Sequence, residues 1–212
     1  MIDRSLTTLI LSIAAPAFAA PAQAPAIDQE LALALGGRAV VPVQVEASIP
    51  YFDQRVKLGA LPSMIAVQME PAQEGEARRT VRALLDASGL AQATVQPSSI
   101  PGWSYIVLPE QGATIQDARL AVTQLSADDG VSVSSLAYLG DGGLPVIPTR
   151  DLLISFAPGS SPAQQSAVLK QYGATIIEHD AGGIPGVIRA QVNARTGDAI
   201  LRTALSINDE PS

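Results

Sequence analysis

The residues closest to a hydrolytic centre are His179 and its neighbouring carboxylate, Asp180. A catalytic triad needs a histidine held between a carboxylate and a serine hydroxyl. Neighbouring strand residues point to opposite faces of a sheet, so these two cannot form that oriented pair on a strand. The Gly-x-Ser-x-Gly turn of many hydrolases does not occur, and residues 159–162 (GSSP) are typical of a turn into a helix N-cap. We predict no catalytic residue, and we interpret His179 as a strand-end residue at a turn.

Two acidic pairs, Asp128-Asp129 and Asp209-Glu210, invite comparison with acid-base centres or calcium sites. Each pair follows a predicted helix, and a calcium loop would need oxygen ligands at regular alternate positions. A polar turn is therefore the prediction for both pairs. The glycine-rich residues 140–143 (GDGG) lack the Lys-Ser or Lys-Thr of a phosphate loop, which favours a linker.

Metal and cofactor chemistry is restricted by the residue counts. One histidine and no cysteine exclude zinc thiolate, iron-sulfur and multi-histidine sites. We therefore predict no metal ligand, no cofactor-binding residue and no cofactor. Without disulfides, an exported chain must be held together by its core.

Aromatic residues alternate along one predicted strand, at Trp103, Tyr105 and the aliphatic Val107. This pattern is compatible with a ligand platform. Half-buried sheet packing explains it equally well, so both interpretations stay open.

Composition sets the class of protein. The chain has 212 residues, of which 47% are hydrophobic and 16% charged, which is enough apolar material for one or two globular domains. The net charge is -7, and lysine and arginine form no basic stripe. Nucleic acid is therefore not an expected partner, and no segment beyond the N-terminus is long and apolar enough to span a bilayer.

The N-terminus is typical of a secretory signal peptide over residues 1–19. Met1 to Arg4 carry one cation, an apolar run follows at 6–15, and Ala17-Phe18-Ala19 offers small residues to a signal peptidase. Cleavage is predicted after Ala19, since a cut after Ala24 would be followed directly by a proline. An N-terminal helix of the folded domain is the alternative. We expect export to the periplasm or secretion.

The remaining sequence is organised as two similar units. Residues 20–63 form an Ala/Pro-rich leader and an unassigned segment, and residues 140–149 form a Gly/Pro linker. The first unit, 64–139, has the order β-α-β-β-α-β, and the second, 150–212, repeats that order through its second helix. Helical spacing places Ala118, Val122 and Leu125 on one face, and Thr114 with Asp117 resembles a capping box.

The repeat predicts a fold class and an unfinished sheet. Ile65 and Val67 correspond to Leu152 and Ile154. The difference in residue number between matching positions of the two units decreases along the chain, as deletions in the loops of the second unit would produce. We expect an α+β protein with two tandem ferredoxin-like units, each an antiparallel sheet with two helices on one face. The second unit lacks its last strand, which would leave an unpaired edge. The sequence is therefore interpreted as truncated, or as completed by another chain.

The second unit resembles the N-terminal prodomains of subtilisin-like serine proteases, especially the fervidolysin-like kind. The shared features are a Phe-x-Pro-Gly turn at 156–159, a helix ending in Tyr-Gly at 165–173, the Ala-Thr-Ile-Ile strand at 174–177, and a late helix ending near 208–211. The first unit shares the resemblance only by repetition. The protease's own Asp-Ser/Thr-Gly, His-Gly-Thr and Gly-Thr-Ser-Met-Ala motifs do not occur.

The resemblance implies a propeptide that acts as intramolecular chaperone and inhibitor of a subtilisin-like catalytic domain, in cis or in trans. It implies no enzyme within these residues, and a serine endopeptidase as the parent if the chain is a fragment. On the outer sheet face we predict four partner-binding residues: Leu153, Ser155, Arg189 and Gln191. The alternative is a free-standing envelope or secreted protein that binds or inhibits a protease or another protein. An independent enzyme on this fold is not expected.

Overall fold

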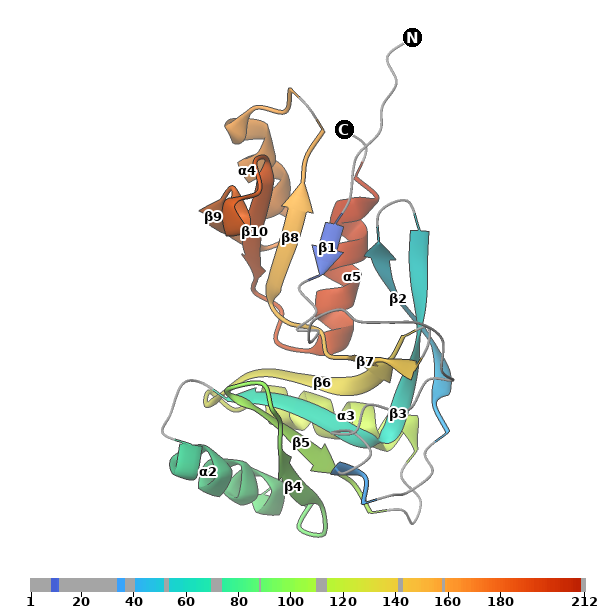
Figure 1. Cartoon of the computed structure of the whole chain (residues 1–212). Coiled ribbons are helices and arrows are strands. Elements are labelled where there is room, and N and C mark those ends of the chain that lie inside the picture. The colour runs from blue at the N-terminus through green and yellow to red at the C-terminus, as the bar shows by residue number, and fades with distance from the viewer. Residues whose placement is uncertain are drawn as a thin grey trace.

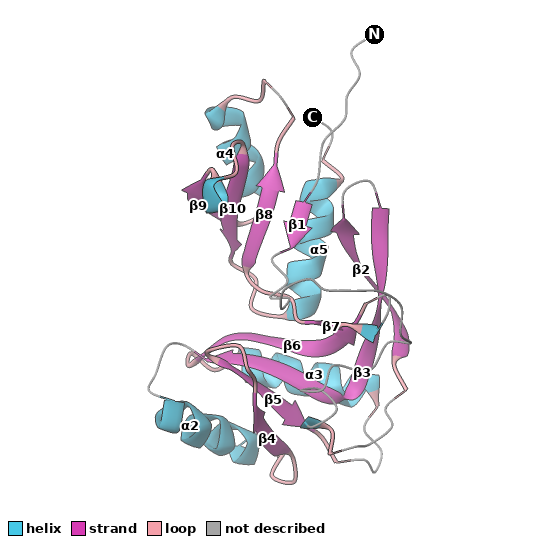
Figure 2. Ribbon diagram, viewed as in Figure 1, coloured by secondary structure: helices cyan, strands magenta, loops and turns pink. Residues whose placement is uncertain are grey.

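The computed structural model contains two antiparallel sheets, each with helices on one face (Figures 1 and 2). It describes residues 9–11, 34–36, 41–51, 54–69, 74–87, 89–109, 114–140, 143–157 and 159–210. Within these ranges, no helix is long and apolar enough to cross a membrane. The α+β class expected from the sequence is confirmed.

The first unit has the strand order of a ferredoxin-like sheet, β4-β5-β3-β6, extended by β7. All pairings are antiparallel, and β2 pairs with the first part of β3. The elements are β2 (Val43–Tyr51), β3 (Gln54–Met69), α2 (Glu74–Ala87), β4 (Thr94–Pro97), β5 (Trp103–Val107), α3 (Ile115–Ser126), β6 (Val131–Leu139) and β7 (Pro145–Val146).

Helix α3 begins where its sequence predicts. Thr114 and Asp117 form a capping box: the Thr114 hydroxyl accepts from the Asp117 amide at 3.2 Å, and the Asp117 carboxylate accepts from the Thr114 amide at 3.0 Å. The helix buries Ala118, Val122 and Leu125 against the sheet, which is the predicted face. The capping box fixes where this helix begins, and its apolar stripe fixes which face packs on the sheet.

Strand β3 differs from the prediction, because it begins at Gln54, well before Met64. The β2–β3 hairpin falls in the segment that the sequence left unassigned. The register between β3 and β6 shifts between Leu61 and Ile65, around Pro62. Proline has no amide hydrogen for the ladder and is tolerated at such bulges, so it bends β3 without ending it.

The second unit has the sheet order β1-β8-β10-β9. Its elements are β1 (Leu9–Leu11), β8 (Asp151–Ser155), α4 (Pro162–Gln171), β9 (Ala174–His179), the short turn η2 (Ala181–Gly183), β10 (Val187–Val192) and α5 (Gly197–Asn208). The described residues end at 210, and α5 is the last element among them. Strand β8 also pairs with β1, which lies within the predicted signal peptide.

The core face of the second sheet matches the expected alternation. Leu152 and Ile154 of β8 are buried, and Phe156 is partly buried against the same core. Strand β10 buries every second residue, and α5 buries Ile200 and Ile207. Helix α4 is capped by Ser161, whose capping box with Gln164 confirms the predicted N-cap.

Helix α5 joins the two units, because it contacts both β2 and β6 of the first unit (Figure 1). At its N-terminus, the Ser134 amide donates to the Arg195 carbonyl at 2.9 Å. The Arg195 guanidinium donates to the carbonyl of Asp128, in the turn before β6, and to that of Val131, the first residue of β6. These bonds fix the start of α5 on the first unit.

Side chains along α5 add further ties between the units. Asp198 accepts a hydrogen bond from the buried Tyr138 hydroxyl and lies 3.2 Å from the Nε of Arg119. At the other end, one guanidinium nitrogen of Arg55 donates to both carboxylate oxygens of Asp209, each at 2.6 Å. Burial, together with the Asp198 carboxylate, raises the pKa of Tyr138.

Candidate partner-binding face

The four predicted partner-binding residues lie together on the outer face of the second sheet. Leu153 and Ser155 alternate with the core residues of β8, and Arg189 and Gln191 alternate with those of β10. Arg189 is directly opposite Leu153 in the antiparallel register. All four side chains are half-buried, so the face is neither sealed in the core nor fully solvated.

Polar side chains on this face are paired with residues that the sequence analysis missed. The Arg189 Nε lies 3.4 Å from a Glu178 carboxylate oxygen, and these side chains are 42% and 43% exposed. The Gln191 amide donates to the Asp151 carboxylate at 3.2 Å. Glu178 and Asp151 lie directly across from Arg189 and Gln191 on the neighbouring strands, so they could have been predicted from the correct strand register.

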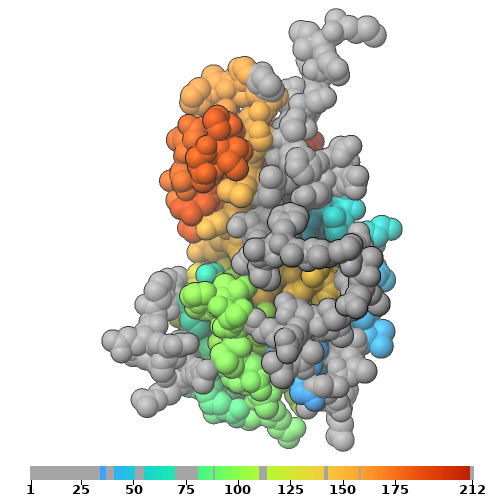
Figure 3. Space-filling model, in the orientation of Figure 1, coloured from blue at the N-terminus to red at the C-terminus, as the bar shows by residue number. Residues whose placement is uncertain are grey.

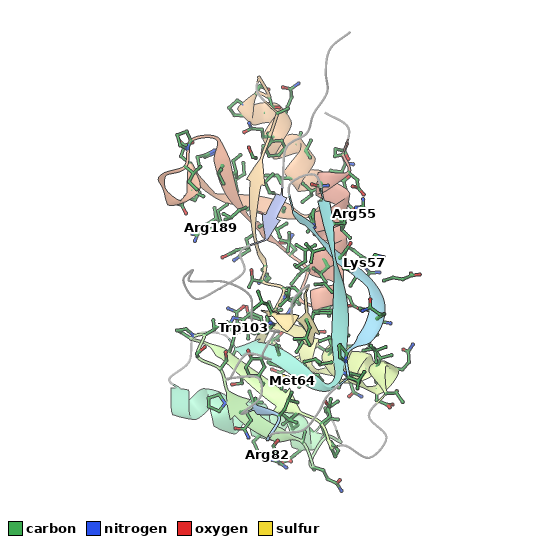
Figure 4. The ribbon with its side chains drawn as sticks, turned by 45° about the vertical axis from the view of Figure 1, so that its right-hand side comes forward. Arg55, Lys57, Met64, Arg82, Trp103 and Arg189 are labelled. Atoms are coloured by element: carbon green, nitrogen blue, oxygen red, sulfur yellow. The ribbon has the colours of Figure 1, made fainter. Side chains whose placement is uncertain are left out.

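A bulge in β9 adds an apolar residue beside this face. Arg189 pairs with Glu178 and Ala190 with Ile176, which leaves Ile177 as the extra residue. Ile177 is 48% exposed, unusually high for a large apolar side chain in a strand. Bulges often redirect a side chain toward a binding surface. Figure 4 labels Arg189 on this sheet, and the orange strands of the unit reach the surface in Figure 3.

The corresponding face of the first sheet is buried along β5. Trp103 and Tyr105 are only 5% and 4% exposed, and Val107 is buried as well. Across the register they lie beside Gln68, Ala66 and Met64 of β3 (Figure 4). Sheet packing therefore accounts for the aromatic alternation, and the ligand-platform interpretation fails. Away from β5, Gln68 and Gln96 on this face of the first sheet are half-exposed, like the side chains on the outer face of the second sheet.

His179 lies at the end of β9, as predicted, and its side chain is exposed. Asp180 follows in a left-handed conformation with φ of 51°. Its carboxylate accepts from the Gly186 amide at 2.8 Å and so closes the turn that leads to β10. Asp180 therefore stabilises the turn between β9 and β10.

The acidic pairs Asp128-Asp129 and Asp209-Glu210 contribute to a turn and to an ion pair. Asp128 accepts from the Gly130 amide at 2.8 Å in the turn after α3, and Asp209 pairs with Arg55 after α5. Within the described ranges, no three His, Cys, Asp or Glu side chains gather as a metal site.

A pocket of about 330 Å³ lies between β2, α3 and α5. Its charged lining consists of Glu46, Arg119, Asp198 and Arg202, two acids and two bases. Arg119 and Asp198 already pair with each other across it. The pocket belongs to the junction between the units.

Comparisons with known proteins assign no family. No family model matches the chain, and no curated protein matches it. Among solved structures, it is similar to the regulatory subunit of aspartate kinase from Thermus flavus, with 16% identity and a TM-score of 0.25. That match covers 80% of this chain and 99% of the other. At this TM-score the likeness carries no inference about function.

Proposed function

We propose that this chain is the prodomain region of an exported subtilisin-like serine protease precursor, and that it assists folding of the catalytic domain and inhibits it. The observation that carries the proposal is the outer face of the second sheet, built on β8 and β10. The sequence resemblance to subtilisin-like prodomains lies in this same unit. This face carries half-exposed side chains along both β8 and β10, whereas the same face of the first sheet is buried along β5.

The chemistry of the face suits a protein partner. Leu153 and Ile177 supply apolar area, while Arg189 is held near Glu178. Interface centres are depleted in charged residues, but they are enriched in arginine, aromatic residues and methionine. The paired strands hold these groups in fixed positions, which reduces the entropy lost on binding.

A free-standing envelope or secreted protein that binds or inhibits a protease, or another protein, would use the same face. The two functions differ in what the gene encodes beyond Ser212. A closing strand followed by an Asp-Ser/Thr-Gly motif supports the prodomain, and a stop codon supports the free-standing protein.

The test measures inhibition of mature subtilisin by the full chain, using hydrolysis of a chromogenic peptide, and the rate at which denatured subtilisin regains activity with the chain present. We expect inhibition and faster recovery. Leu153→Asp removes apolar contact area and places a charged carboxylate in the contact, so it should weaken inhibition at least tenfold, or about 1.4 kcal/mol. Leu120→Asp is the matched control, because Leu120 is 58% exposed on α3, away from this face.

Two results would contradict the proposal. In one, the full chain neither inhibits nor refolds any of a panel of subtilisin-like proteases. In the other, it inhibits, but Leu153→Asp and Leu120→Asp lower the inhibition equally. Circular dichroism melting of both variants separates lost docking from lost fold.

A further inference from the structure

The pocket between β2, α3 and α5 lies where the two units meet. Strand β2 and helix α3 belong to the first unit, and α5, which contacts β2 directly, belongs to the second (Figure 1). The pocket volume of about 330 Å³ is at the lower end of the range of about 300–1,000 Å³ found for small-molecule sites. Such sites also occur preferentially between domains. Position and size therefore suit a small molecule.

Two of the four charged side chains that line the pocket already neutralise each other. One carboxylate oxygen of Asp198 accepts from the Tyr138 hydroxyl, and the other lies 3.2 Å from the Nε of Arg119. Both oxygens of Asp198 are thus engaged within the protein. This network holds Arg119 and Asp198 in place on the pocket wall, and Asp198 has little capacity left for a ligand.

The other two charged side chains, Glu46 and Arg202, are the ones left for a ligand. Among the described residues, neither forms a side-chain hydrogen bond or an ion pair. Glu46 lies on β2 and Arg202 on α5, so an unpaired acid and an unpaired base line the pocket from different units. An anion would be attracted by Arg202 but repelled by Glu46, and a cation the reverse. A molecule that carries both charges satisfies both residues.

The rest of the lining is apolar. It consists of Ala47 on β2 and of Leu201 and Leu205 on α5. Leu201 is only 2% exposed, whereas Ala47 and Leu205 are half-buried. Contact with these side chains removes apolar ligand surface from water, which favours binding of a short hydrocarbon group. The lining thus combines one acid, one base and an apolar wall.

We propose that this pocket binds a small zwitterion in which an ammonium and a carboxylate are joined to a short apolar group, the chemistry of a free apolar amino acid. Glu46 accepts from the ammonium, Arg202 donates to the carboxylate, and Leu201 and Leu205 contact the apolar group. The ligand touches β2 and α5 together, so its binding stabilises the junction between the units. This site is separate from the outer face of the second sheet and does not rest on the proposed function.

The first experiment measures binding to the full chain by isothermal titration calorimetry, with leucine as the probe. Two analogues each lack one charged group: 4-methylpentanoate has no ammonium, and 3-methylbutylamine has no carboxylate. We expect leucine to bind and to raise the melting temperature. Each analogue should bind at least tenfold more weakly, because it leaves Glu46 or Arg202 without a charge-assisted hydrogen bond.

The second experiment assigns each charge of the ligand to its residue. Glu46→Gln should bind leucine no more tightly than 4-methylpentanoate, and Arg202→Gln should bind leucine no more tightly than 3-methylbutylamine. Neither substitution removes an ion pair among the described residues, so both variants should melt like the parent without ligand. Lys170→Gln is the matched control, because Lys170 is exposed on α4 and does not line the pocket. It should leave all three affinities unchanged.

The proposal is overturned if leucine does not bind at millimolar concentrations, or if either analogue binds the parent as tightly as leucine. It is also overturned if Glu46→Gln and Arg202→Gln discriminate between the probes as the parent does, or if Lys170→Gln loses as much affinity as they do. No protease enters either experiment, so failure of the proposed function and failure of this inference give different results.

Discussion

Gly197 at the start of α5 offers a sharp test of the junction between the two units. A Cβ atom placed on Gly197 would lie 1.8 Å from the Ser135 Oγ and 2.6 Å from the Ser135 Cβ. Rotating the Ser135 hydroxyl away does not relieve the second contact, because Cβ is fixed by the backbone. Ser135 is fully buried on β6, so either α5 or β6 must move.

We therefore predict that Gly197→Ala destabilises the protein. Replacing glycine by alanine in a helix interior stabilises it by up to about 1 kcal/mol, and the gain is smaller at Gly197, the first residue of α5. Overpacking a close contact costs about 1–3 kcal/mol, and these distances favour the upper end. The expected net loss is about 2 kcal/mol of unfolding free energy, or about 4–8 °C in melting temperature for a chain of this size.

A double-mutant cycle with Ser135→Gly isolates this contact. Ser135→Gly removes both Oγ and Cβ and leaves the Ser135 Cα at 3.2 Å from the added methyl group. The double variant should recover most of the loss caused by Gly197→Ala, measured against Ser135→Gly alone in urea unfolding. If Gly197→Ala is as stable as the parent, or more stable, the close approach of α5 to β6 is refuted.

Three further predictions concern the core, the junction and a helix cap. Ile154→Asp should unfold the second unit, because a buried unpaired carboxylate costs several kcal/mol. Ser155→Asp on the half-exposed face should melt like the parent, and equal melting of both would show that the faces of β8 are misassigned. Because burial and Asp198 raise the pKa of Tyr138, its neutral form stabilises the fold below about pH 10, and this stability is lost as the pH rises further. Tyr138→Phe should flatten the alkaline fall in melting temperature, and an unchanged fall would contradict that role. Ser161→Ala should cost about 1 kcal/mol in unfolding free energy, since it removes the capping box of α4, and an unchanged urea midpoint would argue against the cap.

The parts of the fold that sequence reasoning predicted are set by local interactions. Helix α3 is defined by its Thr114 cap and its apolar stripe, and the alternation along β8 by Leu152 and Ile154. Periodicity and capping act over a few residues, so a single sequence displays them. The outer-face residues followed from the same alternation.

The parts that were missed depend on distant partners or on breaks in the pattern. The first part of β3 contains Gly59 and Pro62, which resemble loop residues until pairing with β2 and β6 holds them. Gly197 and Arg195 resemble ordinary loop and cap residues, since their roles depend on β6 and the turn before it. Strand β1 carries an apolar run that is equally typical of a signal peptide. Tertiary contacts of this kind leave no local periodic signal.

We propose that the outer face of the second sheet docks on a subtilisin-like catalytic domain, and site-specific cross-linking tests this most directly. Because the natural chain has no cysteine, a single Ser155→Cys can carry a benzophenone photo-crosslinker at a half-exposed position of that face. A matched Leu120→Cys carries it on the exposed side of α3. With mature subtilisin as the probe, we predict a cross-linked complex from position 155 and none from position 120. Equal cross-linking from both positions, or from position 120 alone, would contradict the account.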